Sequence, residues 1–504
     1  MEGENRSKST RDTMDDGYKV LHETFVSGHT GTTAHEILWV SALLPLTLCL
    51  YGMVNVWRRP SHRAHFPTSV LELVLIGCPL LLSLTLFAEV TYYFGLILIA
   101  ILVMGVVTLR STLISRPWRL FLNERFSHDR FLPYLTNYRA GMLLTTAVCI
   151  LAVDFPIFPR KFAKTESFGF GLMDIGVGSF VFVGGMFSPA AQKVTGSYFS
   201  RMQGVKKSLI QSLPLIALGL FRVVLVKGSG YHEHLTEYGV HWNFFLTLAV
   251  TKVLSSILFL IVPVDWSWRA ALTLSLAHES ALVVSYYDWV LENPPRYDLV
   301  NANREGIVSS PGYLAIHLAG VAWGRQFARL ENKVQDHIGQ LKTIVVWSLI
   351  MWSSLYYSCH ELFRPTSRRF ANWTYFNWMV ACNLTLIGLF LLADIVILYF
   401  QDSKPKINRH KFKDSNRKAT PPQTKVNQIT DALKWIRVPL MNEAINYNAL
   451  FYFLLANLFT GSINFIFQTI RTPTCPSLLI LIAYVTILHF ISVFLHSATV
   501  QIKM

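Results

Sequence analysis

The residues of this sequence that are best suited to chemistry lie between positions 151 and 178. An apolar run ends in Asp154, two prolines and the bases Arg160 and Lys164 follow, and Asp174 lies in the next apolar run. Charges at the edge of a membrane span cost desolvation energy, so they usually serve function or anchoring. An acid and a base ten residues apart, around a proline-stiffened turn, suit proton transfer beside a lipid.

Asp154 is the predicted general base. Phe155 precedes a proline, and the residue before a proline is pushed out of helical geometry, so the fourth span should end near there. Asp154 then lies at a helix C-terminus, where the helix dipole and partial burial both disfavour a negative charge. Both effects raise the pKa of the carboxyl group and make it a better proton acceptor. The alternative is an interfacial acid paired with Arg160 or Lys161.

Lys164 is expected near the start of the fifth span, where its ammonium group suits oxyanion stabilisation or phosphate binding. The alternative is a lysine that extends its charge from the bilayer interface. Glu166 is expected to cap the first turn of the same span. Asp174 is expected about two helical turns into it, near Lys164. An acyl-enzyme on Thr165 or Ser167 is a weaker option, because the sequence shows no adjacent base.

Two further polar stretches follow the sixth and eighth spans. The first, YHEHLTEYGVHWN at 231–243, is rich in histidine, but its spacing fits no strong zinc signature and thiolates are absent, so no metal site is predicted. Both stretches suit substrate contacts, and Arg304 suits a bidentate phosphate contact. The alternative is that these side chains only cap helices. The proposed substrate contacts are Arg160, Glu166 and Asp174 of the 151–178 stretch, and Glu237, Tyr238, His241, Trp242, Asn243, Asn301, Asn303, Arg304 and Glu305.

The composition indicates a membrane protein rather than a soluble one. Of the 504 residues, 52% are hydrophobic and 15% charged, and the apolar residues come in blocks long enough to cross a bilayer. We therefore predict an all-α, polytopic bundle with about thirteen transmembrane helices. The candidate spans are 37–57, 70–88, 91–109, 138–154, 168–187, 208–227, 243–263, 266–286, 308–325, 342–362, 374–400, 447–465 and 477–497.

The net charge of +15 is explained mainly by membrane topology. Lys and Arg concentrate in the loops after the odd-numbered spans, which the positive-inside rule places in the cytoplasm. The N-terminus is then lumenal and the C-terminus cytoplasmic. The loops after the fourth, sixth and eighth spans share the lumenal face, so their polar side chains can form one site.

The remaining sequence predicts one membrane domain at 36–504, preceded by a polar lumenal tail at 1–35. The stretch 401–446 reads as a basic, flexible cytoplasmic loop. Sequons at Asn5 and Asn372 fall on the predicted lumenal side. Charged and histidine residues within spans should face the bundle interior; these are Asp174, Arg222, Arg269, Glu279, His317 and Asp394.

Literal runs in these loops resemble a known family. AVDFPxFPRxFAKTE, followed by MDxGVG, HLTEYGVHWNFF and NANREG, is similar to the glucosaminylphosphatidylinositol acyltransferases, the phosphatidylinositol-glycan class W proteins of the endoplasmic reticulum. The similarity covers the three lumenal loops and the number and length of the spans. The departure is Lys161, where an arginine is frequent.

The resemblance implies an O-acyltransferase with about thirteen helices. It would move a fatty acyl chain, typically palmitoyl, from acyl-CoA to the inositol 2-hydroxyl of glucosaminylphosphatidylinositol during GPI-anchor biosynthesis. Asp154 and Lys164 match the acid and the lysine associated with catalysis. The implied partners are the glycolipid, membrane lipids and acyl-CoA as co-substrate, with no tightly bound cofactor and no nucleic acid. The competing hypotheses are a lipid or solute transporter and a non-catalytic scaffold of the pathway.

Overall fold

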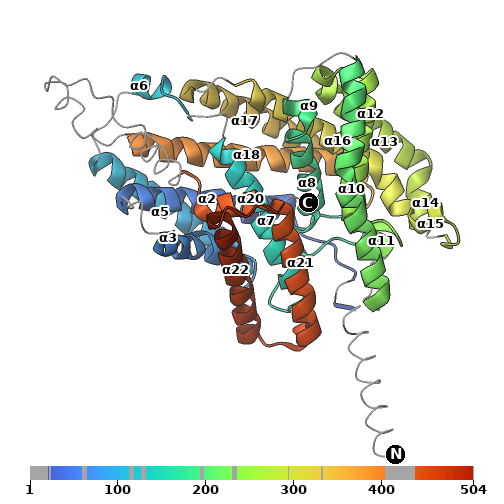
Figure 1. Cartoon of the computed structure of the whole chain (residues 1–504), viewed down its shortest axis with the longest axis horizontal. Coiled ribbons are helices and arrows are strands. Elements are labelled where there is room, and N and C mark those ends of the chain that lie inside the picture. The colour runs from blue at the N-terminus through green and yellow to red at the C-terminus, as the bar shows by residue number, and fades with distance from the viewer. Residues whose placement is uncertain are drawn as a thin grey trace, which may run out of the picture. The chain divides into compact units, whose positions relative to one another are not determined.

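The fold is described from a computed structural model of the whole chain (Figure 1). The structure describes residues 21, 24–25, 27–58, 65–112, 118–126, 132–192, 198–229, 235–292, 294–330, 333–402 and 437–502. Most of the predicted N-terminal tail, most of the 401–446 loop, Asn5, His232 and His234 lie outside these residues.

The described part of the chain is helical and forms no β-strand, which confirms the all-α prediction. Within it, nine helices are long and apolar enough to cross a membrane, so the chain is a multi-pass membrane protein. The predicted count of thirteen is not confirmed. Two predicted spans correspond to shorter apolar helices, Thr68–Ser83 and Asp174–Met186.

The chain forms two compact units. The first comprises Met1–Ile37, Arg160–Ala328 and Met351–Val380. Its helices are α8 (Asp174–Met186), α9 (Pro189–Gln192), α10 (Tyr198–Ser229), α11 (Leu235–Tyr238), α12 (Phe244–Ile261), α13 (Ser267–Ala281), α14 (Tyr287–Leu291), α15 (Leu299–Ala302) and α16 (Arg304–Ala328). A π-helical turn, Leu282–Tyr286, joins α13 to α14.

Helices α8 and α16 pack backbone against backbone in the first unit, where Figure 1 shows them side by side. Gly320 and Gly324 form a GxxxG motif on α16, and Gly185 faces them on α8. A Cβ atom on any of the three would lie 2.0–2.2 Å from a carbonyl oxygen of the other helix. Small residues at such spacings let membrane helices approach closely. This contact holds α8, which begins at Asp174, in a defined position against α16.

The second unit comprises Leu38–Pro159, Arg329–Ile350 and Ala381–Met504. Its helices are α3 (His65–Glu72), α4 (Cys78–Ser83), α5 (Thr91–Thr112), α6 (Trp118–Leu122), α7 (Pro133–Ala152), α20 (Leu440–Tyr447), α21 (Ala449–Ile466) and α22 (Thr474–Ser497). Three helices contribute residues to both units: α2 (Ala34–Arg58), α17 (Val334–Tyr357) and α18 (Trp373–Asp402).

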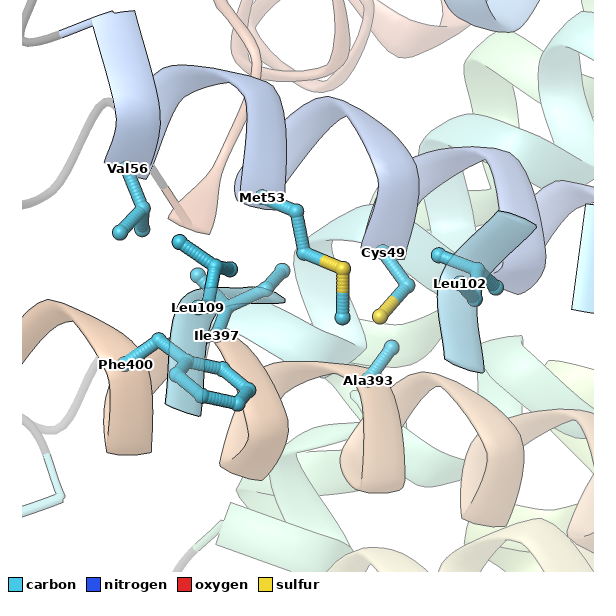
Figure 2. Packing of buried hydrophobic residues seen from close by; sticks show 8 residues of the cluster. All are labelled: Cys49, Met53, Val56, Leu102, Leu109, Ala393, Ile397 and Phe400. Carbon is cyan, nitrogen blue, oxygen red and sulfur yellow. The ribbon is translucent and has the colours of Figure 1, made fainter. Parts of the chain in front are cut away.

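An apolar cluster in the second unit joins α2, α5 and α18 (Figure 2). Met53 of α2 lies among residues of the other two helices in that view. A Cβ atom on Gly52 would lie 2.4 Å from Cδ1 of Ile397, so α2 and α18 are in close contact. The cluster consists of Cys49, Met53, Val56, Leu102, Leu109, Ala393, Ile397 and Phe400.

Two buried carboxylates tie distant segments together in the second unit. Asp394 accepts from Nε and Nη2 of Arg437 at 2.6 and 2.9 Å. Glu72 accepts the backbone N–H groups of Leu440 and Met441 at 2.7 and 2.8 Å, which satisfies the N-terminus of α20. The described chain resumes at Arg437, so these contacts hold the C-terminal end of the 401–446 loop against α18 and α3.

The structure corrects part of the prediction for charges within spans. Asp174, Glu279, His317 and Asp394 are buried as expected, but Arg222 and Arg269 are exposed. Arg269 lies in the first turn of α13, with its guanidinium 5.2 Å from the centre of the Trp266 ring. Arg222 lies near the C-terminal end of α10. Near a helix end, a long cationic side chain reaches polar surroundings without facing the interior.

Candidate functional site

The three polar loops singled out in the sequence meet within the first unit. Lys164 Nζ donates to Glu237 Oε1 at 2.8 Å, which joins the first loop to the second. The Thr236 hydroxyl donates to Glu166 Oε1 at 2.9 Å. The His241 backbone N–H donates to Asn303 Oδ1 at 2.8 Å, which joins the second loop to the third. The structure thus brings the second and third loops together with the Lys164 end of the first.

Asp174 is the first residue of α8, not a residue two turns into a span as predicted. The predicted span began at 168, but residues 168–173 form bends, turns and an isolated β-bridge at Phe170. The carboxylate of Asp174 is fully buried. It accepts from the Thr165 hydroxyl at 2.8 Å and from the backbone N–H groups of Thr165 and Gly171 at 3.1 and 3.0 Å. A carboxylate is favoured at a helix N-terminus. Asp174 therefore folds the Lys164 loop back onto α8.

Glu166 does not cap this helix, contrary to the prediction, because α8 starts eight residues later. Its carboxylate accepts from Thr236 instead, and its backbone N–H donates to the carbonyl of His29. Glu166 therefore connects the first loop to the second and to the segment before α2.

Arg368 is the central cation of the site, and the sequence analysis missed it. Its Nε donates to Asp174 Oδ1 at 2.7 Å and its Nη1 to Glu237 Oε1 at 3.1 Å, while its carbonyl accepts from the Tyr313 hydroxyl at 3.0 Å. Burial alone would lower the pKa of the guanidinium, but Glu237 and Asp174 raise it well above its usual range. Arg368 therefore stays charged and holds both carboxylates.

Glu237 lies between two cations. Burial alone would raise the pKa of its carboxyl group, but the charges of Lys164 and Arg368 outweigh burial and lower this pKa to about 2. Glu237 is thus an anion at any physiological pH and acts as a counter-ion rather than a proton carrier. The Lys164 side chain is 43% exposed and that of Glu237 15%. Of the four paired charges Lys164, Glu237, Arg368 and Asp174, Lys164 has the most exposed side chain and is the most accessible to a substrate.

A tight turn sets the second loop against the third. Gly239 has φ +103°, and a Cβ atom there would lie 2.5 Å from the carbonyl oxygen of Ala302, so glycine is required. Three predicted contacts after this turn have structural partners. Asn243 caps α12 by accepting the N–H groups of Phe245 and Leu246, Trp242 Nε1 donates to Thr247, and His241 is paired with Asn303.

The third loop is organised around Glu305, which is fully buried. Arg296 binds its carboxylate with two hydrogen bonds of 2.6 and 3.0 Å, and Arg369 donates to it at 3.2 Å. Arg304 is also fully buried, and its Nη1 donates to the carbonyl of Pro294 at 2.8 Å. Arg304 therefore has protein partners where the sequence suggested a phosphate contact.

Two other predicted contacts are also occupied by the protein. Asn301 accepts from Trp289 Nε1 at 3.1 Å and donates to Asp298 at 2.6 Å. Tyr238 is 8% exposed, and burial raises the pKa of its phenol. Partners within the protein thus occupy much of this set, and Asn243 caps a helix, as the alternative to substrate binding held.

The segment before α18 supplies both Arg368 and Arg369, and it is buried from Thr366 onward. It also contains the predicted sequon at Asn372. That side chain is fully buried, accepts from the backbone N–H groups of Ser367 and Tyr375, and donates to the Tyr287 hydroxyl. A folded chain therefore does not present Asn372 as a glycan acceptor.

Asp154 belongs to the second unit and Lys164 to the first, so each is placed within its own unit. Helix α7 ends at Ala152, close to the predicted end of the span, and Asp154 follows in a turn. Its side chain is 6% exposed and accepts from Asn464 Nδ2 of α21 at 2.6 Å. Asp154 is thus a nearly buried acid next to a helix end, as predicted.

The bases after Asp154 have local partners in the first unit. The Arg160 guanidinium lies 4.0 Å from the centre of the Phe25 ring, and Lys161 Nζ lies 2.9 Å from Glu36 Oε1. Among the described residues, no group of histidine, cysteine, aspartate and glutamate side chains has metal-site geometry. His241 is the one histidine of the second loop that the structure describes.

Comparison with known proteins identifies relatives over nearly the whole chain. The GWT1 family model matches residues 18–495. The chain is 32% identical over 490 residues to the glucosaminyl-phosphatidylinositol-acyltransferase PIGW of Homo sapiens, an alignment that covers 92% of this chain and 95% of that protein.

Fungal relatives match to the same extent. The chain is 33% identical to the GPI-anchored wall transfer protein 1 of Kluyveromyces lactis, with 97% of this chain and 98% of that protein covered. It is 32% identical to the protein of the same name from Saccharomyces cerevisiae, with 96% and 99% covered.

Proposed function

Because the chain belongs to the GWT1 family, we propose that it is an acyltransferase that acylates the inositol of glucosaminyl-phosphatidylinositol during GPI-anchor biosynthesis. The observation that carries the proposal is the alignment with PIGW, a glucosaminyl-phosphatidylinositol-acyltransferase, over 92% of the chain. The proposal names acyl-CoA, typically palmitoyl-CoA, as donor and the inositol 2-hydroxyl as acceptor, with no tightly bound cofactor.

In the proposed mechanism, Asp154 takes the proton of the inositol hydroxyl as its oxygen attacks the thioester carbonyl. The carbonyl oxygen becomes an oxyanion, which the Lys164 ammonium stabilises. When the tetrahedral intermediate collapses, the C–S bond breaks, the ester forms and the CoA thiolate leaves. The thiolate takes up the proton that Asp154 received, so the products are the acylated glycolipid and free CoA, and Asp154 returns to its carboxylate form. The low exposure of Asp154 and the higher exposure of Lys164 support these roles.

An acyl-enzyme on Thr165 is the alternative chemistry. The structure supplies the base that the sequence did not show, because the Thr165 hydroxyl donates to Asp174 Oδ2 at 2.8 Å. However, Thr165 is 3% exposed and Asp174 fully buried, and Asp174 also accepts from Arg368 and Gly171. A nucleophile needs access and a base free to accept a proton. We therefore propose direct transfer.

We place the protein in the endoplasmic reticulum membrane, with a lumenal N-terminus, a cytoplasmic C-terminus and a lumenal active site. The basis is the distribution of Lys and Arg among the loops. Single cysteines at Lys207, in the polar first part of α10, and at Tyr297, before α15, provide a test in a cysteine-free background. The orientation requires that an impermeant maleimide reach the two positions from opposite sides of the membrane. Labelling of both from the same side would refute it.

Free CoA released by the detergent-purified chain tests the activity. With palmitoyl-CoA and glucosaminyl-phosphatidylinositol together, we expect CoA release and an acylated lipid in equal amounts, and neither product when one substrate is omitted. A transporter would move a substrate across proteoliposomes without consuming the donor. A scaffold would bind the glycolipid and release no CoA. Either result would refute the proposed function.

A further inference from the structure

Glu166 is a carboxylate of the candidate site that lacks a cation partner. Its side chain is half-buried, and its Oε1 atom accepts from the Thr236 hydroxyl at 2.9 Å. Among the described residues, it makes no ion pair. Lys164 lies two residues earlier, but its Nζ atom donates to both carboxylate oxygens of Glu237, at 2.8 and 3.0 Å. The charge of Glu166 is therefore not balanced by direct contact with a described side chain.

The other carboxylates of this network differ from Glu166. Each has a lysine or arginine nitrogen within 2.9 Å, in the pairs Glu36–Lys161, Asp174–Arg368, Glu237–Lys164 and Glu305–Arg296. Arg369 and His29 interact electrostatically with Glu166, but Arg369 donates to Glu305 at 3.2 Å and His29 Nε2 donates to the carbonyl of Phe25 at 3.1 Å. Charges that leave water are usually paired. A half-buried acid without a cation is therefore suited to a cationic group of a ligand.

Helix α11 holds Glu166 close to the Lys164 ammonium. Two adjacent residues of this helix, Thr236 and Glu237, bind the two side chains. Glu166 and Lys164 are two residues apart, so their Cα atoms are separated by no more than about 7 Å. In the proposed reaction, Lys164 stabilises the oxyanion that forms at the inositol oxygen. The glucosaminyl group is attached to that inositol, so its amine is within reach of Glu166 while the inositol reacts.

We propose that Glu166 binds the ammonium group of the glucosaminyl sugar and thereby gives the site a preference for an acceptor that carries an amine. An ammonium group has a positive charge and three N–H donors, which match the unbalanced charge of Glu166 and its second carboxylate oxygen. Charge-assisted hydrogen bonds of this kind are stronger than neutral ones. A sugar with a hydroxyl group in place of the amine lacks the charge and binds more weakly. This inference rests on the proposed function, because it requires glucosaminyl-phosphatidylinositol as acceptor.

Acyl transfer by the full-length chain in detergent, with palmitoyl-CoA as donor, tests the inference. The acceptors are glucosaminyl-phosphatidylinositol and its glucosyl analogue, in which a hydroxyl group replaces the amine. We expect the wild type to have a kcat/KM about tenfold or more higher for the amine-bearing acceptor, the scale of one charge-assisted hydrogen bond. Glu166→Gln should abolish this preference by lowering kcat/KM for that acceptor alone. Its amide oxygen can still accept from Thr236, so the contact between the loops is kept.

Two further variants separate the charge of Glu166 from its contact with the second loop. Glu166→Asp keeps the charge and should keep part of the preference. Thr236→Val removes the hydrogen bond between the loops but leaves the carboxylate, so it should keep the preference whatever its overall activity. Glu292→Gln, at an exposed position after α14, is the matched control and should keep both activity and preference.

Equal kcat/KM of the wild type for the two acceptors would overturn the inference and leave the proposed function standing. An unchanged preference in Glu166→Gln would do the same. An equal loss of activity on both acceptors in Glu166→Gln, or loss of the preference in Thr236→Val, would also overturn it, in favour of a structural role. If the wild type acylates neither acceptor, the proposed function fails as well.

Discussion

Arg368 donates to Asp174 at 2.7 Å, which joins the segment before α18 to the first residue of α8. The same guanidinium reaches Glu237, the counter-ion of Lys164. One buried arginine thus links the ends of two helices to the lysine that we propose as catalytic. Arg368 is a positioning residue in this arrangement, because the Glu237 carboxylate lies between its guanidinium and Lys164.

Arg368→Met should destabilise the protein strongly. It leaves the Asp174 carboxylate buried without its cation, a loss of about 3–5 kcal/mol when one partner of a buried pair is removed. Thermal unfolding of the detergent-purified chain measures the effect. The double variant Arg368→Met/Asp174→Asn should recover part of the loss, because no unpaired charge remains. Equal stability of wild type and Arg368→Met would contradict the described pairing.

Glu237 should make stability depend on pH in the acid range. Its folded pKa of about 2 lies below the value of about 4.3 for an unfolded glutamate. Its contribution is therefore fully present above the unfolded pKa and is lost as pH falls from about 5 toward 2. The difference in thermal midpoint between wild type and Glu237→Gln should shrink over that range. Glu292→Gln, at an exposed position, should show no such trend.

Asp154→Asn should lower the rate of acyl transfer roughly 10²–10⁴-fold, the usual contribution of a general base. The amide can still pair with Asn464, so the fold should survive. The measurement is inositol acylation in membranes at matched protein levels. Asp265→Asn, at a side chain that is 55% exposed, is the control and should keep normal activity. Near-normal activity of both Asp154→Asn and Lys164→Ala would refute the assignment of these two residues as catalytic.

Asn372 should carry no glycan in the folded protein. Glycosidase treatment of wild type and Asn372→Gln should give the same change in gel mobility. The substitution should still lower stability by about 1–3 kcal/mol, because buried N–H groups and a buried hydroxyl lose their partner. A mobility difference that glycosidase removes would show that Asn372 is modified and that its described hydrogen bonds are absent.

Sequence alone predicted the apolar helices from local hydropathy. It predicted the contact between the polar loops from the charge distribution that assigns them to one face. Span length identified the chain as a membrane protein. The expected position of the polar loops on one face predicted that Lys164 and Glu237 share a site. The start of α8 was placed wrongly because the run from 168 is apolar, and hydropathy cannot distinguish a helix from buried turns. Asp174 is that start, and only its backbone contacts reveal it.

Arg368 was missed because its burial depends on segments far away in the sequence. Arg368 lies in a short loop whose sequence shows nothing of its burial, and its partners are 131 and 194 residues away.

The glycine contact between α8 and α16 has a consequence for how the molecule moves. With carbonyl oxygens where Cβ atoms would be, Gly185, Gly320 and Gly324 leave neither helix room to slide or rotate. We therefore expect α8 and α16 to move as one rigid body. Movements that admit a lipid and release a product are therefore expected in helices with fewer contacts, such as α10, which packs chiefly on α12 and leaves most of its apolar stretch exposed. In this fold, we expect movement in the helices that are not held by such close glycine contacts.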